Sequence, residues 1–212
     1  MTAGGPEWAL FDYGVGNLHS LHKALERAGA RATVTDDPMQ LVEADVAVLP
    51  GVGAFGHVMA ALGPAAAGLR ERHQEGRPIV GVCIGQQVLH EGSIEAPGVA
   101  GLGILPGQVE RIPASAGKVP HMGWNTVAHA EDAADGPFAG VPEGGHFYYV
   151  HSFAAPVSPF AIATTDYGGA FAAAEQRGNT LGFQFHPEKS GPLGAQVLRN
   201  TVRWANTLVE AA

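Results

Sequence analysis

Cysteine is nearly absent from this sequence, in which Cys83 is the only one among 212 residues. An intrachain disulfide is therefore excluded, and such low cysteine usage fits a reducing compartment such as the cytoplasm. Basic residues are also few, because 12 Lys and Arg face 20 Asp and Glu and give a net charge of −8. Since no basic cluster offers a footprint for phosphates, nucleic acid is not an expected partner.

Long hydrophobic runs are missing as well. The small-residue stretch 51–69 is interrupted by His57 and Pro64, which argues against a membrane span. The N-terminal segment "MTAGGPEWALFDYG" has no basic region followed by an apolar core, so no signal peptide is expected. The sequence therefore predicts a soluble, cytoplasmic protein that does not use a membrane.

The residues that are abundant are core and turn formers: 46% of the chain is hydrophobic, with 30 Gly and 15 Pro. The length suits a single domain, residues 1–212. In the first half, expected strands at 7–13, 31–35, 45–50 and 77–83 alternate with expected helices at 18–28, 36–44, part of 57–75 and 84–91. This alternation predicts an α/β protein with a three-layer α/β/α, flavodoxin-like and mostly parallel sheet.

The second half has a different pattern. Between residues 100 and 186 several β-like runs are separated by Gly, Pro and Asn turns, and no helical period appears. These runs predict antiparallel or mixed strands that extend or flank the sheet. They are "GLGILPGQVERI", "HFYYVHSF", "FAIATTDY", "GAFAAAEQR" and "NTLGFQF". Apolar residues at helical spacing in 191–212 predict a closing helix.

Cys83 lies between an expected strand and an expected helix, inside "GVCIG". Gly81 and Gly85 leave room for the strained turn that presents a nucleophile. The N–H groups at the start of the following helix would favour a thiolate. A lone cysteine after an apolar strand is equally typical of an inert core residue, so the surroundings of Cys83 leave both interpretations open.

The segment "TLGFQFHPEKS" (180–190) offers a partner for Cys83. Pro187 keeps His186 extended, and on an extended chain His186 and Glu188 point the same way. A carboxylate placed there can fix the tautomer of a histidine that deprotonates a thiol and protonates a leaving amine. A metal pair or a solvated polar turn is the alternative, but no further ligand cluster is visible and no metal is expected.

A glycine-rich loop, "LPGVGAFG" (49–56), follows the third expected strand. Because parallel strands end at the same edge of a sheet, this loop and Cys83 are expected side by side. Gly51 and Gly53 leave the backbone around Val52 free to direct N–H groups at an oxyanion.

Taken together, these elements resemble the triad glutamine amidotransferases, in which a cysteine elbow is followed much later by His-Pro-Glu. In more detail, the sequence is similar to the glutaminase subunits of imidazole glycerol phosphate synthase over nearly its whole length. The motifs that carry the similarity are "DYGVGNLHSL" (12–21), "LPGVGAFG" (49–56), "GVCIGQQVLHEGS" (81–93), "PGVAGLGILPGQVERI" (97–112), "KVPHMGWN" (118–125), "FYYVHSF" (147–153) and "GFQFHPEKSG" (182–191).

The resemblance implies a glutaminase without a cofactor. Cys83 would attack the side-chain amide of L-glutamine, His186 would move the protons, and Glu188 would orient His186. The implied oxyanion donors are backbone N–H groups of Gly51, Val52, Gly53 and Ile84. The implied glutamine-binding groups are Gln87, Glu95 and the backbone at Ser152 and Phe153.

The resemblance also implies a partner, a (β/α)8-barrel cyclase subunit that uses the ammonia to form imidazole glycerol phosphate and AICAR in histidine biosynthesis. The implied docking face contains Val15, Asn17, Trp124, Tyr148 and Lys189. For Trp124, an inward-facing core position is the alternative. The Gly51–Gly53 backbone is expected to stay unproductive until the cyclase binds its nucleotide.

Three positions depart from the family pattern. The elbow usually reads C-L-G-M-Q, whereas this chain has Ile84 and Gln86, and the His-Ser pair is usually followed by Tyr rather than Phe153. Three other interpretations remain open. The first is the glutaminase of pyridoxal phosphate synthase, against which "KVPHMGWN" argues; the others are a dinucleotide-binding protein, whose third glycine is replaced by His19, and a non-catalytic flavodoxin-like binding module.

Overall fold

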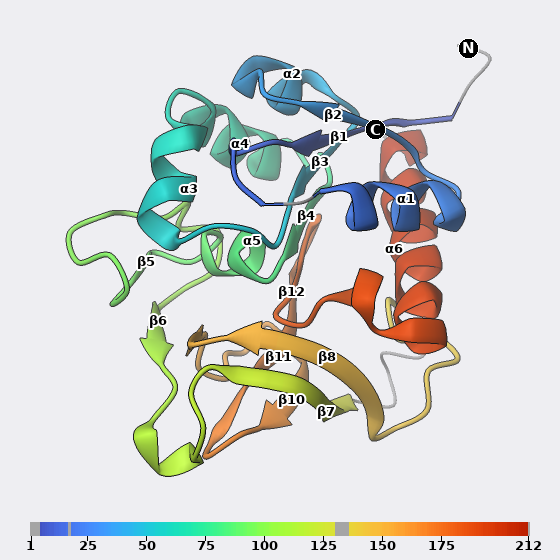
Figure 1. Cartoon of the computed structure of the whole chain (residues 1–212). Helices are drawn as coiled ribbons and strands as arrows, with labels where there is room; N and C mark the ends of the chain where they lie inside the picture. The colour runs from blue at the N-terminus through green and yellow to red at the C-terminus, as the bar shows by residue number, and fades with distance from the viewer. Residues whose placement is uncertain (1–4, 17, 130–135, 212) are drawn as a thin grey trace.

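The structure is a computed structural model that describes residues 5–16, 18–129 and 136–211. Within these residues the strands form one nine-stranded sheet, in the order β2-β1-β3-β4-β12-β11-β10-β7-β8, and a smaller sheet, β5-β6-β9. Figure 1 shows the large sheet running from β2 at the top to the β7–β8 ribbon at the bottom.

The first half alternates strands and helices as predicted. Its strands are β1 (Glu7–Phe11), β2 (Arg31–Thr35), β3 (Val46–Leu49) and β4 (Ile79–Val82). Its helices are α1 (His19–Ala28), α2 (Pro38–Glu43), α3 (Phe55–Leu62), α4 (Ala65–Gln74) and α5 (Ile84–Gln87). All pairings among these strands are parallel, which confirms the predicted parallel sheet.

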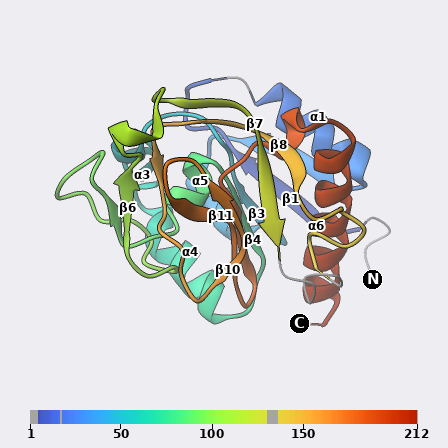
Figure 2. The same ribbon diagram turned by 90° about the horizontal axis from the view of Figure 1, so that it is seen from below.

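Two apolar layers hold the helices on the sheet. On one face, α1 and the closing helix α6 (Gly191–Ala211) bury Leu21, Leu25, Val197 and Leu198 against Trp8, Leu10, Val48 and Val82. On the other face, α2 to α5 bury Leu41, Phe55, Leu69 and Ile84 against Phe11, Ala47, Leu49 and Ile79. Figures 1 and 2 show α1 and α6 on one side and α3, α4 and α5 on the other, which confirms the three layers.

The second half supplies the remaining strands. They are β5 (Gly92–Ser93), β6 (Gln108–Arg111), β7 (His121–His129), β8 (Gly145–His151), β9 (Phe153–Ala154), β10 (Ala161–Asp166), β11 (Ala170–Arg177) and β12 (Thr180–Phe183). The described residues also form two short 3₁₀ turns, η1 (Ala114–Ala116) and η3 (Pro187–Lys189). The pairs β12–β11, β11–β10, β10–β7 and β7–β8 are antiparallel, as expected for this half.

Three details of the prediction were wrong. The region 57–75 contains two helices, because the chain turns at Gly63 and Pro64. The helix after Cys83 ends at Gln87 rather than at residue 91. Strand β7 was not predicted, because its exposed outward residues obscure the strand pattern. Strand β12 fits the expected mixed arrangement, since it is parallel to β4 and antiparallel to β11.

Strands β7 and β8 form a ribbon with two different faces. His121 lies opposite His151, and Trp124 lies opposite Tyr148. Since side chains alternate along a strand, His121 and Asn125 share one face of β7 while Met122 and Trp124 share the other. The histidine face is turned inward and Trp124 outward, as their exposed fractions of 3% and 55% show.

Candidate active site

The turn at Cys83 has the strained geometry of a nucleophile elbow. Cys83 connects β4 to α5 with φ 50° and ψ −109°, and it is the only non-glycine residue in the described part of the chain with a positive φ. A Cβ on Gly85 would lie 2.0 Å from the carbonyl oxygen of Leu49, and one on Gly81 would lie 2.5 Å from that of Gly85. The backbone passes so close to both positions that only glycine fits at either. A nucleophile turn requires such glycines, whereas an ordinary core cysteine does not.

His186 reaches the same place because β12 lies parallel to β4, so both strands end at one edge of the sheet. The loop after β3 also ends there. A Cβ on Gly51 would lie 2.7 Å from Cε1 of His186 and 3.0 Å from Cβ of Cys83. Position 51 therefore brings its backbone into direct contact with both side chains, and only glycine fits.

Glu188 determines the proton position on His186. Nδ1 of His186 lies 2.7 Å from Oε1 of Glu188, and a carboxylate can only accept, so Nδ1 carries the hydrogen. Nε2 has no hydrogen-bond partner among the described residues, so it is the nitrogen available to the sulfur. The side chains of His186 and Glu188 are 3% and 6% exposed, so water screens their interaction little.

The electrostatics of this pair favour a protonated imidazole. Burial by itself lowers the pKa of His186. The negative charge of Cys83, and the hydrogen bond and charge of Glu188, outweigh burial and raise that pKa to about 10. An imidazolium at this position can give its proton to a leaving nitrogen.

The backbone around His186 is partly as predicted. His186 is extended, with φ −98° and ψ 96°, which confirms the effect of Pro187. The prediction that the extended chain continues to Glu188 was wrong, because Pro187–Lys189 form a 3₁₀ turn that swings Glu188 back onto the ring. Strand β8 holds this turn, since the N–H of His186 donates to the carbonyl of Tyr148 at 2.9 Å.

A pocket of about 250 Å³ opens beside Cys83. It brings together predicted residues from both halves of the chain: Gly53, Cys83, Ile84, Gln87, Glu95, Ser152 and Phe153. It also includes residues that the sequence reasoning missed: Pro120, Val150 and His151. Pro120 and His151 lie inside the quoted motifs "KVPHMGWN" and "FYYVHSF", but nothing in the pattern indicates which way they face.

Two predicted pocket residues are already anchored. Gln87 donates from Nε2 to the carbonyl of Phe153 at 2.8 Å and to Oε1 of Gln184 at 3.0 Å. Gln184, another residue that was missed, donates to Sγ of Cys83 at 3.6 Å. Glu95 accepts the N–H of Phe55 at 2.9 Å, which places its carboxylate at the N-terminus of α3.

The wall of the pocket is supported by a chain of hydrogen bonds through His121 and His151. Nδ1 of His151 lies 2.8 Å from the carbonyl of Phe153 and must donate to it. Nε2 of His151 therefore accepts from Nδ1 of His121 at 3.0 Å, and Nε2 of His121 accepts from Asn125 at 3.3 Å. Burial lowers the pKa of His121 to about 4 and that of His151 to about 3, so both rings are neutral at pH 7.

The Gly51–Gly53 loop contacts the loop that follows β1. The side chain of Val52 occupies the space beside Gly16, where a Cβ would lie 2.6 Å from Cβ of Val52. A Cβ on Gly53, which has φ +98°, would lie 3.3 Å from Cγ2 of Val15. The glycine loop thus packs against the "DYGVGN" segment.

Three of the predicted docking residues are neighbours on the surface. Trp124 is 55% exposed, so the core alternative for this residue is wrong. Its ring meets that of Tyr148 edge-to-face at 6.1 Å, and Nζ of Lys189 lies 5.9 Å from the Tyr148 ring centre. Val15 is half-buried, and Asn17 lies outside the described residues.

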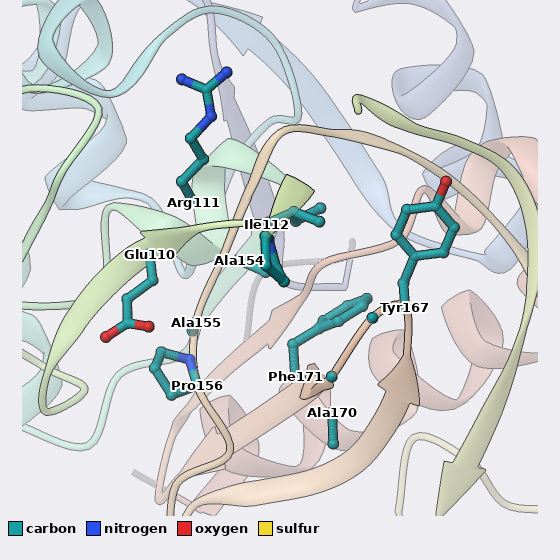
Figure 3. A pocket seen from close by; sticks show the side chains of 12 residues that line it. Glu110, Arg111, Ile112, Ala154, Ala155, Pro156, Tyr167, Ala170 and Phe171 are labelled. Atoms are coloured by element: carbon teal, nitrogen blue, oxygen red, sulfur yellow. The ribbon is translucent and has the colours of Figure 1, made fainter. Parts of the chain in front are cut away.

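A second pocket, shown in Figure 3, has Tyr167 and Phe171 in its lining, and both rings also contact the histidine chain. Tyr167 stacks on His121 and Phe171 meets His151 edge-to-face, while Ile112 and Pro156 complete an apolar lining. The hydroxyl of Tyr167 already donates to the carbonyl of Lys118 at 2.7 Å. The lining also includes the exposed, charged residues Glu110 and Arg111, and no predicted site residue lines this pocket.

Neither a metal-ligand cluster nor a membrane-crossing helix occurs among the described residues. They contain no group of three or more His, Cys, Asp or Glu side chains placed to hold a metal ion. None of their helices combines the length and apolar character that crossing a membrane requires.

Comparisons with known proteins agree with this geometry. Residues 9–204 match the family model of glutamine amidotransferase class-I. A solved structure described as a glutamine amidotransferase aligns with TM-score 0.70 and 18% identity, covering 95% of this chain and 98% of that one. The structure of PurLQS from Thermotoga maritima aligns with TM-score 0.71 and 21% identity over 94% and 99%. The chain belongs to the class-I glutamine amidotransferases.

Curated relatives narrow the assignment. Imidazole glycerol phosphate synthase subunit HisH of Moorella thermoacetica is 47% identical, covering 91% of this chain and 92% of the relative. The HisH subunits of Methanothermobacter thermautotrophicus and Thermus thermophilus are 48% and 46% identical, each over more than nine-tenths of both chains. Within its class the chain is a member of the HisH family, the glutaminase subunits of imidazole glycerol phosphate synthase. This membership leaves the three alternative interpretations without support.

Proposed function

We propose that Cys83, His186 and Glu188 hydrolyse L-glutamine through a covalent thioester. The Cys83 thiolate attacks the side-chain carbonyl carbon, and the C–N bond then breaks as His186 gives its proton to the leaving nitrogen, releasing ammonia. Water next attacks the thioester, His186 takes one of its protons, and the C–S bond breaks to give glutamate. The observation that carries this proposal is the geometry at the elbow: the strained turn presents Cys83, and the imidazole of His186, 2.7 Å from Glu188, lies against the same Gly51 backbone as Cys83.

The oxyanion of each tetrahedral intermediate would form beside the elbow. Ile84 is the first residue of α5, so its N–H has no acceptor inside the helix. We assign this N–H and the backbone of Gly51, Val52 and Gly53 to the oxyanion. The pocket supports a glutamine whose backbone groups meet Glu95, Gln87, Ser152 and Phe153.

We also propose that the ammonia passes to a separate (β/α)8-barrel cyclase subunit, which forms imidazole glycerol phosphate and AICAR. Residues 1–212 would then be one cytoplasmic glutaminase domain that works as half of a heterodimer. The exposed cluster of Trp124, Tyr148 and Lys189 supports a docking face, since exposed aromatic side chains are typical interface hot spots.

Docking would control the glycine loop. Val15, on the proposed docking face, touches Gly53, and Val52 packs beside Gly16. A partner that moves the "DYGVGN" segment would therefore change the Gly51–Gly53 backbone directly, and flanking glycines make a peptide rotation inexpensive. We expect negligible glutaminase activity from the isolated subunit and a large increase with cyclase and its nucleotide; equal activity with and without the partner would contradict this.

The test is ammonia and glutamate release by the reconstituted pair, with wild type compared with Cys83→Ala. Loss of the nucleophile should reduce the rate by at least about 10³-fold, because the thioester pathway is closed. The control is a Glu71→Gln variant, which changes an exposed residue of α4. It shows whether preparing a variant and assembling the complex affect the rate by themselves. Full activity of Cys83→Ala would end the nucleophile assignment.

A further inference from the structure

Gln86, the residue that departs from the usual elbow sequence, is completely buried behind the nucleophile. Its Nε2 donates to Oε2 of Glu175 at 2.9 Å. Glu175 lies on β11 and is also 0% exposed. An ionised carboxylate without water is costly unless other groups neutralise and hydrogen-bond it, so the remaining contacts of Glu175 matter.

Two more donors meet this carboxylate. Nε2 of His90 lies 2.8 Å from Oε2, and the hydroxyl of Ser158 donates to Oε1 at 2.7 Å. Burial alone raises the pKa of Glu175, but His90, Ser158 and Gln86 outweigh it and lower that pKa. The side chain is therefore a carboxylate with both oxygens occupied.

His90 supplies the compensating charge. Its Nδ1 lies 3.0 Å from the carbonyl oxygen of Pro106, which can only accept, so Nδ1 carries a hydrogen. Its Nε2 faces the same Oε2 that already accepts from Gln86, so Nε2 carries a hydrogen as well. An imidazole with hydrogens on both nitrogens is a cation, and His90 is only 1% exposed.

We propose that His90 and Glu175 form a buried ion pair that holds the nucleophile elbow in place through Gln86, which makes Glu175 a positioning residue for the glutaminase reaction. This inference rests on the proposed function. It assigns a role to the polar residue that replaces the methionine of the usual elbow sequence.

The elbow needs such an anchor because α5 contains only four residues. A single helical turn has little stability of its own and depends on tertiary contacts. The N–H of Gln86 donates to the carbonyl of Cys83 at 3.0 Å, so movement at Gln86 reaches the nucleophile directly. Gly182 opposite leaves the space for this side chain, since a Cβ there would lie 2.6 Å from Cγ of Gln86.

The anchor is separate from the substrate pocket. Gln86, His90 and Glu175 do not line the pocket beside Cys83, whereas the adjacent Gln87 does. Loss of the ion pair should therefore misplace Cys83 and the N–H of Ile84 without removing a glutamine contact. The expected signature is a lower kcat with little change in KM.

Glu175→Gln in the reconstituted complex is the direct test. The amide keeps the shape of the side chain but removes the negative charge. Its NH₂ group would also face hydrogen-bond donors, where the carboxylate oxygen accepted from them. We expect kcat for glutamine hydrolysis to fall by about 10-fold or more, with KM changed less than about twofold. Glu71→Gln on the exposed face of α4 is the matched control and should leave both unchanged. Wild-type kcat in Glu175→Gln would overturn the proposal.

Gln86→Met keeps the proposal testable if Glu175→Gln does not fold. Methionine has a similar length, and the variant cuts only the link between elbow and ion pair, leaving His90 and Ser158 on Glu175. It should lower kcat by about 3- to 10-fold, and unchanged kcat in the folded variant would remove the anchoring role.

A nitrogen NMR spectrum of the wild-type protein at pH 7 tests the charge independently of activity. The ring of His90 should show two protonated nitrogens, and one unprotonated nitrogen would overturn the ion pair. If the wild-type complex releases no ammonia while His90 is doubly protonated, the proposed function fails and the ion pair stands.

Discussion

His186 and the His121–His151 pair lie in equally buried surroundings but have opposite electrostatics. Their exposed fractions are 3%, 3% and 6%. The pKa of His186 is raised to about 10, whereas those of His121 and His151 are lowered to about 4 and 3. Burial acts in the same direction on all three, so the difference comes from the partners.

Those partners fit two different tasks. His186 lies between Glu188 and Cys83, whose negative charges favour the imidazolium that a leaving amine needs as proton donor. The hydrogen-bond partners of His121 and His151 among the described residues are each other, a side-chain amide and a carbonyl, all of them uncharged, so both rings stay neutral and hold fixed tautomers. The same residue type therefore moves protons on one side of the pocket and supports the wall on the other.

Cys83→Ala should produce the largest change, because it removes the charge that distinguishes His186. Burial then lowers the pKa of His186 with only Glu188 opposing it, so this pKa should fall well below 10. An NMR titration of the His186 ring in wild type and variant measures the difference. A pKa that stays near 10 in the variant would assign the whole effect to Glu188.

Glu188→Gln should reduce kcat by about 10²- to 10⁴-fold, since it keeps an acceptor for Nδ1 but loses the charge that stabilises the imidazolium. Steady-state kinetics of the assembled complex give kcat and KM separately. KM should change little, because Glu188 does not line the glutamine pocket. A variant with near-normal kcat would show that Cys83 alone sets the charge of His186.

Part of this contrast could be predicted from the sequence. Gly81, Cys83 and Gly85 are local, so their strained turn is visible as a motif, and His186 and Glu188 are separated by a single residue. The histidine chain was missed because it depends on the pairing of β7 with β8, which places His121 opposite His151 across a long loop. Register of this kind follows from tertiary packing rather than from spacing.

The buried network at Gln86 shows the same limit. The sequence marks Gln86 as unusual, but its partners His90 and Glu175 lie on a turn and on a strand that is distant along the chain. Strand β12 is similar, since its position beside β4 brings His186 to Cys83 yet breaks the antiparallel order of its neighbours. Long-range contacts of this type carry no local signal.

The two regions should respond to pH with opposite sign. A raised folded-state pKa stabilises the fold below the ordinary value of 6.5, and this contribution of His186 is lost as pH rises through about 10. The lowered pKa values of His121 and His151 act the other way: their contribution is full above 6.5 and is lost as pH falls toward about 4 and 3.

The change in unfolding free energy is easier to measure at acidic pH than at alkaline pH. Each of these two histidines should add about 1.4 kcal/mol per pH unit to the loss of unfolding free energy below pH 6.5. Urea unfolding between pH 7 and pH 4 should therefore show a shallower slope in His121→Phe than in wild type. Identical slopes would mean that His121 is already protonated in the folded protein at pH 5.

His121→Phe should have the smallest effect on catalysis, and a specific one. The phenyl ring can keep the stacking on Tyr149 and Tyr167, whose centroids lie 4.7 and 4.0 Å from that of His121. It cannot donate to Nε2 of His151, so His151 is no longer held in the tautomer and orientation that support the Phe153 carbonyl.

Because that carbonyl also accepts from Gln87, the loosened wall should weaken glutamine binding and raise KM by about 3- to 10-fold while kcat stays near wild type. His22→Phe on α1, whose ring also bonds a backbone carbonyl but lies outside the pocket, is the matched control and should leave KM unchanged. An unchanged KM in His121→Phe would confine the neutral histidine pair to a structural role and leave His186 as the only histidine that acts on glutamine.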